Sequence, residues 1–149
     1  MRAVVQRVRS ASVAADSAVA GAIQRGLLVL LGVGLGDEET DSSCLAEKVF
    51  GLRVFADSRG QMNLALSDVG GEILVVSQFT LFGDCRKGRR PSYAQAAPAE
   101  QAERLYRHFI ERLRALGARV AEGVFGAMMN VSLVNDGPVT LLLDSRRLF

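Results

Sequence analysis

The sequence is poor in the residues from which metal centres and disulfide scaffolds are built. Its 149 residues include one histidine, two cysteines and no tryptophan. Cys44 and Cys85 match neither a metal-ligand spacing nor a disulfide framework. We therefore expect no metal, no cofactor and a reducing compartment, and the sequence assigns no role to either thiol.

The sequence also lacks a strong net charge and a long apolar run. The formal net charge is +2, so an anionic partner would have to contact a local basic patch. A membrane-spanning helix needs about 18 or more consecutive apolar residues, and no run of that length occurs. The amino-terminal segment has no signal-peptide core either. These absences predict a cytoplasmic protein without a membrane partner.

What the chain does contain is enough apolar material for one core. The hydrophobic fraction is 49%, which is typical of a folded α+β protein of one domain. Short apolar runs predict strands, with 11–15 and 18–23 as a hairpin and 27–33 as a central strand covered on both faces. The predicted strands before residue 128 are 3–8, 11–15, 18–23, 27–33, 62–66, 72–79 and 119–122.

Two segments have helical periodicity. The first helix is predicted from Thr40 or Asp41 to Ala56, with the acids of 37–41 at the positive end of its dipole. The second is predicted to begin at Pro98 and to end before Gly117. His108 falls outside the apolar stripe of the second helix, which favours a solvated surface histidine over a general base.

A tight turn, Asn135–Thr140, lies between the apolar runs 128–134 and 139–143. From the pattern alone this is a β-hairpin connection. Gly137 permits backbone geometries that a Cβ would forbid, and a Gly-Pro peptide bond is one of the few that can be cis.

A polar stretch, Ser77–Thr80, ends the predicted strand 72–79. Its hydroxyls, amide and backbone N–H groups can bind a carbonyl, a ribose or an oxyanion. No histidine or carboxylate stands beside it to activate a hydroxyl nucleophile. The residues alone leave open whether Ser77 and Thr80 bind a ligand or only satisfy backbone groups. The basic residues that follow, Arg86, Lys87, Arg89 and Arg90, form either a phosphate-binding loop or a solvated one.

These motifs resemble the D-aminoacyl-tRNA deacylases of the bacterial and eukaryotic type, over essentially the whole chain. The match includes an Asn-x-Gly-Pro-x-Thr motif at 135–140. One departure from the family's pattern is Tyr93, where phenylalanine is usual. The other matching segments are Met1–Val8, Ser77–Leu81, Lys87–Tyr93 and Phe125–Met129. The elements and this resemblance predict an α+β fold in which mainly antiparallel sheets form a barrel-like core with two main helices packed outside.

The resemblance implies an ester hydrolase of translation quality control. Its substrate would be D-aminoacyl-tRNA, cleaved to free D-amino acid and tRNA, with L-aminoacyl-tRNA rejected. Glycine has no Cβ, so glycyl-tRNA mischarged on tRNA-Ala would also be admitted. The alternative is a nucleic-acid-binding module without catalysis.

The resemblance also implies a homodimer with active sites at the subunit interface. A cis Gly137–Pro138 segment of one subunit would enter the partner's Ser77–Thr80 site and act as a chirality filter. Ser77, Gln78, Phe79 and Thr80 would form the catalytic site, with Gln6, Arg7, Phe125, Met129, Asn135 and Thr140 around the substrate and its adenosine. Core packing is an equal alternative for Phe125 and Met129. Either Thr80 or the tRNA 2′-OH would drive hydrolysis, and the lack of a base favours the 2′-OH.

Overall fold

Strand β1 (Arg2–Ala15) is paired along both edges in the computed structural model, which describes residues 1–148. It pairs antiparallel with β2, β3 and β8, and the sheet continues through β6 and β7, which run parallel to β3. The strands around β1 are β2 (Ala18–Ile23), β3 (Gly26–Gly32), β6 (Glu72–Ser77), β7 (Arg119–Glu122) and β8 (Met129–Asp144). The predicted hairpin and central strand are confirmed.

The two ends of the sheet curl toward each other. A Cβ on Gly21 of β2 would lie 2.7 Å from the carbonyl oxygen of Glu122 in β7, so only glycine allows this approach. The curled sheet encloses an apolar cluster that includes Val13, Leu28 and Leu74, all fully buried. The predicted barrel-like core is therefore confirmed.

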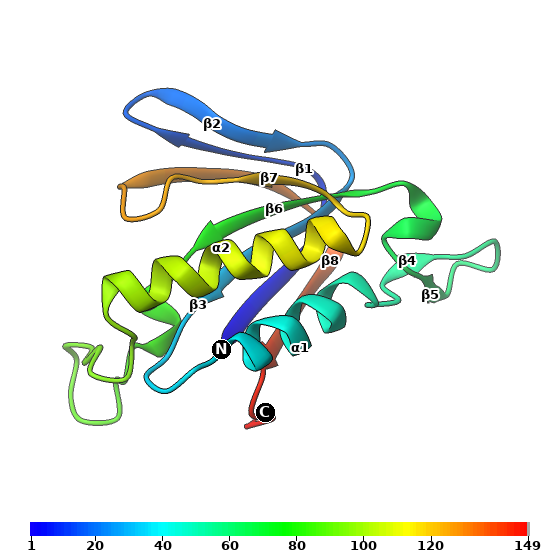
Figure 1. Cartoon of the computed structure of the whole chain (residues 1–149). Helices are drawn as coiled ribbons and strands as arrows, with labels where there is room; N and C mark the ends of the chain where they lie inside the picture. The colour runs from blue at the N-terminus through cyan, green and yellow to red at the C-terminus, as the bar shows by residue number, and fades with distance from the viewer. Residues whose placement is uncertain (149) are drawn as a thin grey trace.

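Two helices cover the outer face of this sheet (Figure 1). They are α1 (Glu39–Phe50) and α2 (Ala99–Ala115), which pack against each other and against β1, β3 and β6 in one apolar core. The apolar stripe predicted for α2 is the buried one: Leu105, Tyr106, Phe109, Ile110 and Leu113. No helix within residues 1–148 is both long and apolar enough to cross a membrane.

The prediction for the end of α1 was wrong. The helix begins with a capping box between Glu38 and Asp41 and ends at Phe50, where the Gly51 N–H donates to the Glu47 carbonyl at 3.0 Å. The next residues are extended, and Phe55–Ala56 forms β4 with β5 (Met62–Leu64). Phe55 is buried as the apolar period requires, but a strand supplies that burial.

The predicted final hairpin was also wrong. Both apolar runs belong to one strand, β8, and both pair antiparallel with β1. The register jumps at the turn: Asn135 faces Val8 and Thr140 faces Gln6, so residues 136–139 bulge out opposite Arg7 alone. A bulged strand and a hairpin have the same local sequence pattern, and only the shared partner strand separates them.

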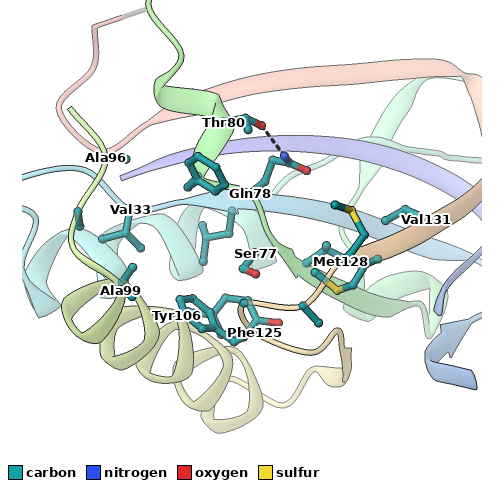
Figure 2. Close-up of a pocket in the computed structure, with 18 residues that line it drawn as sticks. Val33, Ser77, Gln78, Thr80, Ala96, Ala99, Tyr106, Phe125, Met128 and Val131 are labelled. Carbon is teal, nitrogen blue, oxygen red and sulfur yellow. Dashed lines mark hydrogen bonds between the residues drawn. The ribbon is translucent and has the colours of Figure 1, made fainter. Parts of the chain in front are cut away.

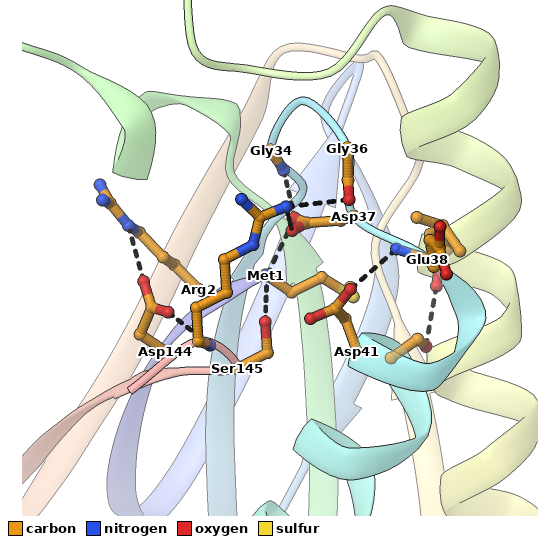
Figure 3. A network of polar contacts seen from close by, with 12 residues as sticks. Met1, Arg2, Gly34, Gly36, Asp37, Glu38, Asp41, Asp144 and Ser145 are labelled. Carbon is orange, nitrogen blue, oxygen red and sulfur yellow. Dashed lines mark hydrogen bonds and ion pairs between the residues drawn. The ribbon is translucent and has the colours of Figure 1, made fainter. Parts of the chain in front are cut away.

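A buried carboxylate joins the start of β1 to the segment after β8 (Figure 3). Asp37 accepts hydrogen bonds from the Gly34 N–H at 2.6 Å and from Arg146 at 3.2 Å. Its Oδ2 also lies 2.9 Å from the amino group of Met1, which donates to Ser145 Oγ. Asp37 precedes the N-cap of α1, at the positive end of the helix dipole as predicted, and it also joins Met1 to Arg146.

Candidate active site

A cavity of about 680 Å³ opens where β6 ends (Figure 2). Ser77 is the last residue of β6, and Gln78 leads into the short 3-10 helix η2 (Phe79–Phe82). The first turns of α2 form one wall, and residues 125–129 together with Val131 form another. The cavity thus lies at the polar strand end that the sequence singled out.

The wall that α2 contributes is made of small side chains and one ring. Ala99 and Ala102 face the cavity, and Tyr106 lies deeper with its ring centre 5.7 Å from that of Phe125. Sequence reasoning missed these residues because their spacing reads as the core stripe of a helix. Ala99 and Ala102 leave space for the cavity that larger side chains at these two positions would fill.

Phe125 and Met129 both line the cavity. Each also packs against an apolar core, Phe125 against the helix core and Met129 against the barrel core. Their neighbour Met128 lines the cavity with 90% of its surface exposed. An apolar side chain so exposed at a cavity rim is available to a ligand or a second protein surface.

The polar side chains that line the cavity carry no charge. They are Ser77, Gln78, Thr80 and Tyr106. The Gln78 amide donates to Thr80 Oγ1, and the Tyr106 hydroxyl donates to the Val75 carbonyl at 3.0 Å. Burial raises the pKa of Tyr106 well above its ordinary value, so this hydroxyl stays neutral. None of the lining side chains is a base for Thr80.

Backbone donors meet the same edge of the cavity. The Gln78 N–H donates a hydrogen bond to the Leu31 carbonyl at 2.7 Å and is therefore not available to a ligand. The first N–H groups of a helical turn have no acceptor within that turn. Because η2 begins at Phe79 and both Phe79 and Thr80 line the cavity, their N–H groups are candidate donors to a ligand there.

The Gly137–Pro138 turn does not line the cavity of its own chain. Its peptide bond is cis, and Gly137 has a φ of +125°. Arg7 secures it: Nε donates to the Asp136 carbonyl at 3.2 Å, and Nη1 donates to the Val54 carbonyl. Asp136 also forms an ion pair with Arg7 at 3.2 Å.

The remaining predicted pocket residues surround this turn. The Asn135 amide donates to the carbonyls of Arg7 and Val139 at 3.0 and 3.1 Å, which closes the base of the bulge. Thr140 Oγ1 donates to Gln6 Oε1 at 3.3 Å. Gln6, Arg7, Asn135 and Thr140 therefore lie together, but not at the cavity of the same chain.

The basic loop follows η2 and is pinned at its base. Asp84 and Ser92 exchange two backbone hydrogen bonds, of 2.8 and 3.0 Å. Within the loop the Arg86 guanidinium donates two hydrogen bonds to the Asp84 carboxylate, from Nε to Oδ1 at 2.9 Å and from Nη2 to Oδ2 at 2.6 Å. These hydrogen bonds hold the pKa of the Asp84 carboxyl far below its ordinary value. The predicted phosphate residues thus share one exposed loop, and Arg86 already has an anionic partner.

His108 is not the solvated surface residue that the pattern favoured. Its side chain is 28% exposed, and Nδ1 lies 3.0 Å from Ser42 Oγ, between α1 and α2. Nε2 lies 4.0 Å from a Glu39 oxygen, so the three residues resemble a hydrolase triad. Ser42 is fully buried and none of the three lines the cavity, so the cluster is a polar contact between helices.

Comparison with known proteins identifies the family of the chain. Residues 4–144 match a family model described as D-Tyr-tRNA(Tyr) deacylase. The chain is 58% identical over 149 residues to a D-aminoacyl-tRNA deacylase of Thermotoga petrophila. It is 56% identical over 149 residues to a D-aminoacyl-tRNA deacylase of Thermosipho africanus. Each alignment covers 100% of this chain and 100% of the relative.

Two solved structures share the fold. One, described as a c-Myc DNA unwinding element binding protein, is 44% identical with a TM-score of 0.90 and covers 97% of this chain and 98% of its own. A probable eukaryotic D-amino acid tRNA deacylase is 17% identical with a TM-score of 0.82, over 95% of this chain and 97% of its own, and bears on the fold alone. With the family match, the predicted resemblance is confirmed: the chain belongs to the D-aminoacyl-tRNA deacylases, a family of enzymes that hydrolyse an ester of tRNA.

Proposed function

We propose that the cavity at Ser77–Thr80 hydrolyses the ester between a D-amino acid and the terminal ribose of tRNA, in the cytoplasm. One observation carries this assignment: a largely apolar cavity of about 680 Å³ whose uncharged polar groups lie mainly at one edge. That volume falls within the roughly 300–1,000 Å³ of ordinary ligand sites. An unpaired adenosine suits the apolar walls, and an ester carbonyl suits the donors at the edge.

The adenine base occupies the part of the cavity near Phe125 and Met129, where an aromatic face is available for stacking. The ribose and its ester then lie against Ser77 and Gln78. The N–H groups of Phe79 and Thr80 donate hydrogen bonds to the carbonyl oxygen and stabilise the negative charge that develops on it when water attacks. Every contact in this arrangement is uncharged, so specificity rests on shape and hydrogen bonding.

Proton transfer in this proposal depends on the substrate. The cavity lining contains no histidine, carboxylate or amine. The 2′-OH of the terminal ribose is adjacent to the ester and can orient and activate the attacking water. The ester bond breaks, the 3′-oxygen takes up a proton, and the free D-amino acid and tRNA leave.

Replacement of Thr80 by alanine is expected to leave most of the activity. The Thr80 hydroxyl accepts one hydrogen bond, from Gln78, and one such bond is worth about 0.5–1.5 kcal/mol. We expect kcat/KM on D-Tyr-tRNA to fall by about tenfold or less, measured by release of D-tyrosine. Loss of a catalytic nucleophile costs on the order of 10⁶-fold. A loss of that size, with unfolding and tRNA binding unchanged, would establish Thr80 as the nucleophile.

We further infer that the enzyme is a homodimer in which each subunit completes the other's site. The Gly137–Pro138 turn projects from β8 and does not reach its own cavity. Within residues 1–148, β8 pairs only with β1, and its apolar residues Val134 and Leu142 are 53% and 60% exposed. A second copy that covers this strand could bring its turn to the cavity.

The turn then acts on the α-carbon of the substrate. Its backbone carbonyl groups leave space for the hydrogen of a D-residue and collide with the Cβ of an L-residue. Repulsive overlap can exceed the roughly 1–3 kcal/mol that a pocket gains from one methylene. Glycine presents hydrogen on both sides, so glycyl-tRNA mischarged on tRNA-Ala is admitted as well.

The basic loop supplies contacts to the tRNA backbone. Replacing Arg86, Lys87, Arg89 and Arg90 together by alanine should weaken tRNA binding and reduce its salt dependence. Because Arg86 is already paired with Asp84, we expect about three contacts to be lost. The slope of log K against log salt should therefore shrink by roughly 2–3. Titrations of tRNA at several salt concentrations measure this, and an unchanged slope would remove the loop from the interface.

A second candidate function is nucleic-acid binding without catalysis. The specific observation in its favour is the 44% identical solved structure described as a DNA unwinding element binding protein. A deacylation assay with D-Tyr-tRNA and L-Tyr-tRNA separates the two. Release of D-tyrosine alone supports the deacylase, whereas binding of tRNA without release of either amino acid supports the second candidate.

A further inference from the structure

An exposed aromatic pair stands at the mouth of the cavity. The rings of Phe79 and Tyr93 meet edge to face, with their centres 5.1 Å apart and their planes at 69°. They are 56% and 38% exposed, although phenylalanine is among the residue types most often buried. We propose that this pair contacts the side chain of the substrate's amino acid and favours aromatic D-amino acids over D-alanine. This inference rests on the proposed function and extends it to a preference among its substrates.

The pair lies where the aminoacyl end of the substrate has to lie. In Figure 2, Ser77 lies between Thr80 and Phe125. The proposed function places the adenine near Phe125 and the ester carbonyl against the N–H groups of Phe79 and Thr80. The amino acid then extends from the ester on the side away from the ribose. Phe79 lines the cavity and is largely exposed, so its ring borders the cavity at this open end.

Tyr93 is held in place before any substrate binds. Ser92, the residue before it, exchanges two backbone hydrogen bonds with Asp84, and the Ala96 N–H donates to the Tyr93 carbonyl at 2.9 Å. The ring lies against the backbone of Gly83, where an added Cβ would be 3.1 Å from Tyr93 Cε1. A surface that is already ordered binds a side chain at a smaller entropic cost.

The chirality of the amino acid and the nature of its side chain are read at different places in this arrangement. The Gly137–Pro138 turn meets the α-carbon, whereas the aromatic pair meets the atoms beyond Cβ. An edge-to-face pair leaves ring surface open, on which a further aromatic side chain packs through apolar burial and ring–ring contact. The single methyl group of D-alanine gains little from either. The side chains that line the cavity are uncharged, so an aromatic side chain suits this environment.

The test uses one tRNA charged in turn with D-tyrosine, D-phenylalanine and D-alanine, so that the substrates differ only in the amino acid side chain. The readout is kcat/KM for each aromatic substrate divided by kcat/KM for D-alanyl-tRNA, after the rate without enzyme is subtracted. We expect both ratios to be about three to ten for the unmodified enzyme. The gain should appear in KM, because the contact is the same in the ground state and the transition state.

Two substitutions of Tyr93 separate the ring from its hydroxyl. Tyr93→Leu removes one ring of the pair and keeps an apolar side chain, so both ratios should fall several-fold toward one. Tyr93→Phe keeps the ring, so both ratios should stay at the level of the unmodified enzyme. Thermal unfolding of each variant confirms that the compared proteins are folded.

Phe50→Leu is the matched control. It also replaces a partly buried aromatic ring by leucine, but Phe50 ends α1, packs against the helix core and does not line the cavity. Its substitution should leave both ratios unchanged.

The outcomes separate this inference from the proposed function. Ratios near one for the unmodified enzyme, as when the partner subunit covers the pair, overturn the inference, while hydrolysis of all three D-substrates upholds the proposed function. Ratios that Tyr93→Leu does not reduce also overturn it, whether the absolute rates stay constant or fall together, because the ring then serves the fold or the RNA. Failure to hydrolyse any D-aminoacyl-tRNA overturns the proposed function.

Discussion

A tRNA that ends in 2′-deoxyadenosine is expected to be hydrolysed on the order of 100- to 10,000-fold more slowly than one that ends in adenosine. That range is the usual contribution of general acid–base catalysis. The cavity lining holds no group of its own for this task, since Ser77, Gln78, Thr80 and the neutral Tyr106 are its polar side chains. The 2′-OH of the substrate is then the group closest to the reacting carbonyl.

Single-turnover deacylation of D-Tyr-tRNA with either terminal nucleoside measures this effect. Competition binding shows whether the deoxy substrate still occupies the site, so that slow chemistry is not confused with weak binding. A tRNA with deoxyribose at the preceding nucleotide is the control, because it removes a 2′-OH that lies one step from the ester. Equal rates on both terminal nucleosides would contradict the RNA-assisted route.

The predictable parts of the fold are those with one strong local signal. Helix α2 begins beside Pro98, ends before Gly117 and buries its apolar stripe, as periodicity predicted. Helix α1 ends at Phe50, where the Gly51 N–H donates to the Glu47 carbonyl, although Phe55 keeps the helical period. Periodicity reports which residues are buried, and it does not distinguish a helix from an extended segment that returns to the same core.

The course of β8 depended on a distant partner. The runs before and after Asn135–Thr140 have the composition of two hairpin strands, yet both pair with β1. Strand pairing at a separation of more than a hundred residues leaves no local mark in the sequence. The same is true of the contact between Arg2 and Phe82, which forms only because β1 and η2 are neighbours in space.

The sequence predicted the polar residues of the candidate site, but it did not predict the residues of α2 that line the cavity. Ser77–Thr80 ends a strand with hydroxyls and an amide, which is a local property, and these residues line the cavity at the end of β6. Ala102 and Tyr106 line the same cavity from α2, where their spacing is that of an ordinary core stripe. Arg7 was expected beside the substrate, but in its own chain it secures the Gly137–Pro138 turn.

Substitution of Gly137 by alanine is expected to reduce hydrolysis of D-Tyr-tRNA by about 100-fold, the effect of a displacement of about 1 Å at a reacting centre. Gly137 has a φ of +125°, which an L-residue rarely adopts. The added Cβ would lie 2.9 Å from Arg7 Nη2 and 2.9 Å from Val139 Cγ2, so the turn has to move. Rejection of L-Tyr-tRNA should weaken as well, because the displaced carbonyls no longer exclude its Cβ.

Gly117→Ala is the control for backbone strain. Gly117 also has a left-handed φ, +96°, but no atom lies within 4 Å of the Cβ position, and it follows α2 away from the turn. Both variants should lose about 1–3 kcal/mol of stability from the disfavoured backbone, measured by denaturant unfolding. Only Gly137→Ala should change the rates on D- and L-Tyr-tRNA. Unchanged rates and chirality in Gly137→Ala would remove the turn from the site.

Mixed dimers decide whether the turn acts on its own subunit or on its partner. Ala102→Trp fills the cavity and leaves the turn intact, whereas Gly137→Ala alters the turn and leaves the cavity intact. If the turn acts across the interface, a mixed dimer of the two variants pairs one intact cavity with one intact turn, and activity returns on mixing. If each turn served its own cavity, every site in the mixture would carry one defect and activity would stay at the level of the separate variants. Because the turn does not line its own cavity, we expect the mixture to recover at least several times the activity of either variant alone, with selectivity for the D-substrate restored.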